Sequence, residues 1–169
     1  MIMTALGAAV VLTGAAFAKS GLMADDQKFL RAAAQGGMAE VAMGHLAVEK
    51  ASSPDVKAFG QRMIDDHGKA NERLKALANS KSFKLPGHIN PEQKSMKEKL
   101  AGLSAADFDR QYMKHMAEDH VKDVAEFQTE SVDAKDADIK KFAASTLPTL
   151  KEHLKMAQDL AAKTGAKGK

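Results

Sequence analysis

The chain has 169 residues, enough for one domain with a substantial core, and its net charge at pH 7 is only +3. The absence of cysteine excludes disulfides, cysteine-ligated zinc, iron–sulfur clusters, thiol catalysis and a lipid-modified N-terminal cysteine. Charges alternate in sign along the chain, and no stripe of lysine and arginine forms, so we expect no nucleic-acid partner. Aromatic residues make up 5% of the chain and helix-forming residues dominate, which predicts an all-α fold.

The N-terminal stretch 1–18, MIMTALGAAVVLTGAAFA, carries no charged side chain and ends in small residues around Ala16-Phe17-Ala18. An apolar core followed by an A-x-A cleavage site is typical of an export signal. We expect cleavage near Lys19 and export to the periplasm, with an uncleaved membrane anchor as the alternative. The mature domain would then be a bundle over residues 19–163, followed by a disordered tail at 164–169.

Apolar residues recur at spacings of three and four along most of this domain. The pattern predicts four long helices, at residues 24–51, 54–80, 105–132 and 136–163. Short polar residues suited to N-terminal capping stand at the helix starts, namely Asp25 or Asp26, Ser53, Ser104 and Asp136. Pro148 lies inside the last helix and should kink it.

The longest break in the helical pattern covers residues 81–104. Pro86-Gly87 is a strong helix breaker, and Asn90-Pro91 begins a short helix that ends near Gly102. A loop and a short helix are long enough to return along the length of a bundle. We therefore predict two helical hairpins joined by a long crossover, which makes a ferritin-like four-helix bundle.

Four polar residues stand on the apolar faces of the four long helices, each near the middle of its helix: Glu40, His67, His120 and His153. In a bundle of helices of equal length, helix midpoints share one layer, so these side chains should meet in the core. One carboxylate and three imidazoles form a ligand set that suits zinc, iron, copper or nickel. The alternative is that these histidines are core residues whose nearby acids satisfy their hydrogen bonds without any metal.

An acidic residue directly precedes each of the three histidines, namely Asp66, Asp119 and Glu152. A residue one position back points about 100° away on a helix, so each acid could hydrogen-bond the histidine of a neighbouring helix. Met63 and Met116 lie one turn before His67 and His120, and as thioether ligands they would favour copper(I). The alternative for both methionines is flexible filling of the core.

Glycines cluster on either side of Glu40, at Gly36, Gly37 and Gly44. A glycine inside a helix costs about 1 kcal/mol relative to alanine, so each needs a compensating role. We expect them to permit close helix approach or to leave space beside the carboxylate. The helices carry no E-x-x-H, no H-E-x-x-H and no phosphate-binding loop, which argues against a di-iron centre and favours binding over catalysis.

Three phrases, GGMAEVAMGHLAVEKASSPDVKAFGQRMIDDHGKA, FDRQYMKHMAEDH and IKKFAASTLPTLKEHLKMA, resemble an exported bacterial family known only as domain of unknown function 4142. The resemblance covers roughly residues 23–162, and members of this family are often labelled outer-membrane proteins. It implies a ferritin-like bundle in the periplasm but no established activity. The family pattern matches at Glu40, Asp66, His67, Asp119, His120 and His153.

Two hypotheses follow. In the first, the protein is a periplasmic bundle that stores, buffers or senses a transition metal (zinc, iron or copper), in connection with envelope stress. In the second, it is a non-catalytic interaction or stress module in which the acid–histidine pairs fix the helix register. A protein partner in the envelope and association with the outer membrane stay open, and the sequence does not predict the oligomeric state.

Overall fold

A computed structural model describes residues 21–165 of the chain. Within these residues the protein is all-α, with helices α1 (Ala24–Lys50), α2 (Pro54–Ser80), α3 (Pro91–Ala101), α4 (Ala105–Asp133) and α5 (Ala137–Lys163). None of these helices has the length and apolar content needed to cross a membrane. The predicted export signal at 1–18 and most of the predicted disordered tail lie outside the described residues.

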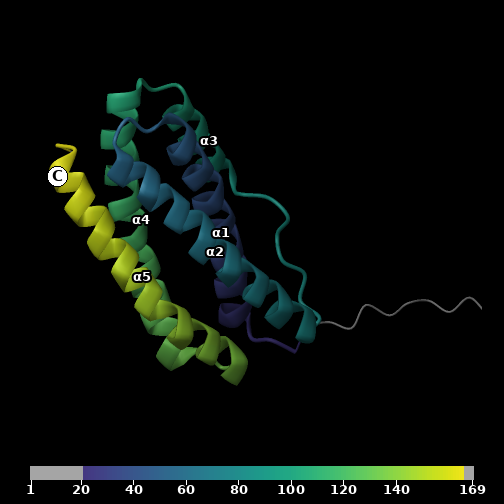
Figure 1. Ribbon diagram of the computed structural model, residues 1–169. Helices are drawn as coiled ribbons and strands as arrows, with labels where there is room; N and C mark the ends of the chain where they lie inside the picture. Colours follow the sequence, from purple (N-terminus) through teal and green to yellow (C-terminus); the bar gives the residue numbers. More distant parts are fainter. Residues whose placement is uncertain (1–20, 166–169) are drawn as a thin grey trace, which may run out of the picture.

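The four long helices form two antiparallel hairpins, α1 with α2 and α4 with α5, which pack against each other (Figure 1). The chain leaves α2 at one end of the bundle and starts α4 at the other. Residues 81–90 and α3 cover this distance along the outside, and α3 packs on α1 and α4. The prediction of a ferritin-like four-helix bundle with one long crossover is confirmed. Pro148 lies inside α5, and the helix continues through it.

Two buried aspartates close the hairpin turns, and each comes from the opposite hairpin. Asp109 of α4 accepts hydrogen bonds from the main-chain N–H groups of Ser52 and Ser53, at 3.1 and 2.8 Å. Asp26 of α1 accepts from the N–H groups of Lys135 and Asp136, both at 3.0 Å. These N–H groups belong to the turns that precede α2 and α5, so each hairpin needs the other to satisfy its turn.

The predicted helix caps are correct for one hairpin only. Ser104 and Asp136 accept hydrogen bonds from the first turns of α4 and α5, as expected. Asp25 and Asp26 do not cap α1, whose N-cap position is Met23. Ser53 stands at the N-cap of α2 without a side-chain bond, and its own main-chain N–H donates to the carboxylate of Asp109.

The apolar core consists of two clusters, one toward each end of the bundle. One contains Met43, Met63, Met116 and Ala157 from the four long helices; the other contains Leu30, Leu74, Phe127 and Leu150 from the same helices. In α2, α4 and α5 the buried histidine falls between the helix's contributions to the two clusters, and in α1 Glu40 stands directly after Ala39, at the edge of one cluster. A polar layer therefore crosses the bundle at mid-height and divides the core.

Helices α1 and α2 approach each other closely next to this layer, on the side of the cluster that contains Met43 and Met63. A Cβ atom on Gly44 would lie 2.7 Å from the carbonyl oxygen of Gly60, and one on Gly60 would lie 2.7 Å from the Cβ of Ala47. A Cβ on Gly37 would meet the side chain of Asn71. These contacts agree with the expected close approach. Gly36 differs, because a Cβ there would have no neighbour within 4 Å.

Candidate metal centre

The polar layer brings together the four residues that the sequence analysis selected. Glu40 comes from α1, His67 from α2, His120 from α4 and His153 from α5, and their exposed fractions are 1%, 6%, 0% and 0%. One ring nitrogen from each of the three histidines lies within 4.8 Å of the others. Four helices thus each deliver one buried donor residue to one place.

Each histidine has one ring nitrogen fixed by an acceptor. The Nδ1 of His67 lies 2.7 Å from Oε2 of Glu40, and the Nε2 of His153 lies 2.9 Å from Oδ2 of Asp66. The Nδ1 of His120 lies 3.0 Å from the main-chain carbonyl of Met116. Carbonyl and carboxylate oxygens only accept, so these nitrogens carry the hydrogens. The opposite nitrogen of each neutral ring then presents a lone pair, as metal-binding histidines do.

The opposite nitrogens have no hydrogen-bond partner in the described part of the chain. These buried orphans are Nε2 of His67, Nε2 of His120, Nδ1 of His153 and, beside them, Oε1 of Glu40. Such groups are rare in folded proteins because each forfeits the hydrogen bonds that it made in water. The Nε2 of His120 and Oε1 of Glu40 are 3.3 Å apart without hydrogen-bond geometry. Two acceptors facing each other at this distance require a cation or a proton between them.

The charges in the layer favour a cation. Burial raises the pKa of Glu40, but the three histidines around it outweigh burial and lower the pKa to about 2. Burial lowers the pKa of His67, yet the charge and hydrogen bond of Glu40 raise it above the ordinary value overall. Burial lowers the pKa of His153 to about 4, against the opposing effect of Asp66. At neutral pH, Glu40 is therefore an anion and the ring of His153 is neutral.

The three acids predicted to support the histidines behave differently from one another. Asp66 bonds His153 on the neighbouring helix, as expected. Glu152 does not reach a histidine: its exposed carboxylate lies 2.7 Å from Nη2 of Arg62, whose Nε lies 3.1 Å from Asp66. Glu152 therefore pairs with Arg62 of α2 in the described structure, and its expected role beside a histidine stays a prediction.

The third acid, Asp119, forms no hydrogen bond with a histidine and instead joins Glu40 and Asp123. One carboxylate oxygen from each of these three residues lies within 4.8 Å of the other two. Burial, with Glu40 and Asp119 nearby, raises the pKa of Asp123 well above its usual range. The sequence analysis missed Asp123, although its position four residues after Asp119 places both on one face of α4.

Met63 and Met116 are fully buried and belong to one of the apolar clusters. The contact of Met116 with the histidines is made by its main-chain carbonyl. This placement agrees with a core-filling role, and their role as soft ligands stays a prediction.

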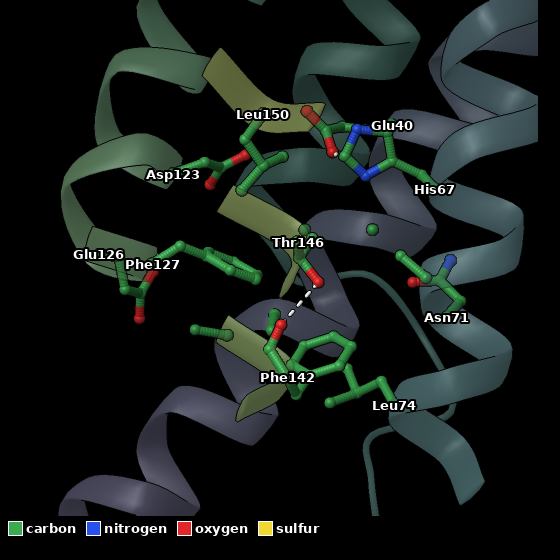
Figure 2. A pocket seen from close by; sticks show the side chains of 15 residues that line it. Glu40, His67, Asn71, Leu74, Asp123, Glu126, Phe127, Phe142, Thr146 and Leu150 are labelled. Atoms are coloured by element: carbon green, nitrogen blue, oxygen red, sulfur yellow. Dashed lines mark hydrogen bonds and ion pairs between the residues drawn. The ribbon is translucent and has the colours of Figure 1, made fainter. Parts of the chain in front are cut away.

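Two hollows adjoin the layer. The smaller is a cavity of about 30 Å³, large enough for a water molecule or an ion, and Glu40, His67 and Asp123 line it together with Thr146 (Figure 2). The larger is a surface groove of about 280 Å³ between α2 and α5, lined by Asp66, His67 and His153 among others. The groove is open to solvent and lies beside two of the histidines.

The donor set fits a transition metal of the kind the sequence analysis expected. Three imidazole nitrogens and one carboxylate oxygen suit zinc, copper, iron or nickel. In a tetrahedral site with bonds of roughly 2.0–2.1 Å, neighbouring donors stand about 3.3–3.4 Å apart. The 3.3 Å between His120 and Glu40 already matches this spacing.

Together, the fold and these side chains define a ferritin-like helical bundle with a buried layer of histidines and acids. Residues 12–160 match the model of a family described as a domain of unknown function, DUF4142. The chain belongs to this family, which confirms the resemblance noted in its sequence. Among curated proteins, no match to the chain is significant.

Solved structures with the same fold include two DUF305 proteins. A DUF305 fragment from Deinococcus radiodurans has a TM-score of 0.74 and 13% identity, covering 84% of this chain and 98% of that one. A DUF305 protein from Streptomyces coelicolor, described as secreted, has a TM-score of 0.71 and 16% identity, covering 86% and 96%. A third structure is CopM in its Cu(II)-bound form, with a TM-score of 0.70 and 17% identity, covering 82% and 96%.

Proposed function

We propose that the protein binds one transition-metal ion in the polar layer, through His67, His120 and His153, with Oε1 of Glu40 as the fourth donor. The observation that carries the proposal is the set of orphaned ligand atoms in the described residues: three buried ring nitrogens and one carboxylate oxygen without partners. A metal ion would satisfy all four atoms at once. Its charge would also balance the buried Glu40 anion.

The outer hydrogen bonds support the same conclusion. Glu40, Asp66 and the carbonyl of Met116 each fix the tautomer of one histidine so that its lone pair points away from the acceptor. If the acid–histidine pairs were only a core network, the network would be half satisfied, and such networks are costly. The metal ion completes the network that these contacts begin.

Storage or buffering fits the site better than catalysis. Four protein donors occupy all coordination positions of a tetrahedral metal ion, whereas catalytic metal sites leave one position open for water or substrate. The groove beside Asp66 and His153 gives the ion a way in and out. We assign this role to an exported protein, because residues 1–18 resemble an export signal and one structural neighbour is described as secreted.

Copper is the first ion to test. The neighbour CopM is described in a Cu(II)-bound form, and imidazole ligands suit Cu(II). Zinc, iron and nickel are the comparison ions, because the same donors suit them.

The test is elemental analysis of protein purified without a histidine tag, followed by thermal melts with each ion. An ion present at 1,000 times its Kd should stabilise the fold by about 4 kcal/mol. Alanine at His67, His120 or His153 should each remove the bound ion, whereas His45→Ala, at an exposed position of α1, should not. Unchanged metal content in all three core variants would refute the proposal.

The second candidate is a metal-free interaction module, and the Asp66–His153 and Glu40–His67 pairs are the observation in its favour. It predicts that no metal co-purifies and that no ion raises the melting temperature. Alanine at His153 would then destabilise the fold by about 1–3 kcal/mol, with or without metal, because Asp66 would lose one of its two partners and keep only Arg62.

A further inference from the structure

Of the three carboxylates at the edge of the histidine layer, Asp119 and Asp123 form no ion pair in the described part of the chain. Glu40 is 1% exposed, and Asp119 and Asp123 are half-buried. No lysine or arginine within residues 21–165 lies within 4.0 Å of Asp119 or Asp123. Three acids packed within 4.8 Å of one another repel, so the fold brings them together against their mutual repulsion.

A second observation points to a ligand at this place. Oε1 of Glu40 is buried and has no hydrogen-bond partner among the described residues. Glu40 and Asp123 also line the same cavity of about 30 Å³, approaching it from α1 and α4 (Figure 2). Two carboxylates, one of them with an orphaned oxygen, thus line a single space of ionic size.

We propose that Glu40, Asp119 and Asp123 form a second cation site, selective for a hard divalent ion such as Mn²⁺, with Glu40 shared between this site and the histidine site. Oxygen-only ligands suit manganese, magnesium and calcium, whereas the imidazoles suit softer transition metals. The polar layer then holds two chemically different sites side by side. This goes beyond the single ion of the proposed function.

The geometry also explains why Glu40 lies at the centre of the layer. Its Oε2 faces His67, its Oε1 faces His120, and its carboxylate belongs to the acidic group as well. A carboxylate with two oxygens can contact two ions at once, as in two-metal centres. Asp119 and Asp123 contribute to the second ion only, so the two sites can be separated by mutation.

The test is titration of the full-length protein with Mn²⁺. The electron paramagnetic resonance signal of free Mn²⁺ measures how much of the ion stays unbound at each step. One Mn²⁺ should bind per chain, both in metal-free protein and after loading with Zn²⁺, which gives no such signal. Asp123→Asn should raise the Kd for Mn²⁺ by about tenfold or more, because it removes a ligand. Glu126→Gln is the matched control: Glu126 lines the same cavity from α4 but stands outside the acidic group.

The outcomes separate this inference from the proposed function. Retention of Mn²⁺ binding together with loss of Zn²⁺ binding in His120→Ala would show two sites. A failure of Zn²⁺, copper, iron and nickel to bind would end the proposed function but leave the Mn²⁺ result standing. An absence of Mn²⁺ binding, or equal Mn²⁺ affinity in Asp123→Asn and the unmutated protein, would overturn the second site.

Discussion

Replacing Gly44 with alanine should weaken the protein, although alanine is the better helix former. The new Cβ would lie 2.7 Å from the carbonyl oxygen of Gly60, 3.1 Å from Cγ1 of Ile64 and 3.3 Å from Cβ of Met63. The carbonyl belongs to the α2 main chain, so α1 and α2 must move apart. Overpacking of this kind costs about 1–3 kcal/mol, and alanine returns about 1 kcal/mol of helix propensity. We expect a net loss of up to roughly 2 kcal/mol.

Gly36→Ala in the same helix is the matched control, because its Cβ would meet nothing within 4 Å. It should gain up to about 1 kcal/mol, which raises Tm by about 2–4 °C for a domain of this size. Gly44→Ala should lower Tm by up to about 8 °C on the same scale. Thermal melts that compare the Tm of both variants with that of the unmutated protein test this prediction. Equal stabilisation by the two substitutions would show that the close approach at Gly44 does not constrain the helices.

Three further predictions concern buried polar groups. Burial lowers the pKa of His153 from 6.5 to about 4, so as the pH falls this histidine is protonated in the unfolded chain before it is protonated in the folded one. The free energy of unfolding should therefore fall by up to about 3 kcal/mol between pH 6.5 and pH 4. Glu40, with a pKa of about 2, should add a further loss below pH 4.5, and urea unfolding across this range measures both effects. Tyr112→Phe should stabilise the fold by up to about 1 kcal/mol in thermal melts, because the hydroxyl is buried without a partner in residues 21–165; a loss of stability would contradict this. Asp109→Ala should cost about 1–3 kcal/mol in urea unfolding, because it leaves the turn before α2 without its acceptor; a change below about 1 kcal/mol would mean that water replaces the carboxylate.

The fold was predictable because its determinants are local and periodic. The apolar spacing gave the long helices to within about two residues. The break at Pro86-Gly87, followed by a short helix, indicated a crossover and not a tight turn. The histidine layer was predictable for the same reason, because residues at helix midpoints meet when the helices have equal length. His67, His120 and His153 needed no information beyond helix length and face.

The remaining contacts were not predictable, because they join residues that are distant in the chain and unrelated in pattern. Nothing local distinguishes Asp26 or Asp109 from an ordinary acid near a helix start, yet each caps a turn on the opposite hairpin. Glu152 looked equivalent to Asp66 in sequence, and only the path of the Arg62 side chain separates them. Asp123 was overlooked because it stands beside no histidine in the chain.

The exchange of aspartates between the hairpins bears on how the chain folds and how it can be cut. A fragment holding only α1 and α2 would leave the turn at Ser52-Ser53 without the carboxylate of Asp109, and a fragment of α4 and α5 would lack Asp26 in the same way. Neither half is then a self-sufficient folding unit. The bundle should unfold in a single cooperative step, and proteolytic nicking of the 81–90 loop should leave the two pieces associated.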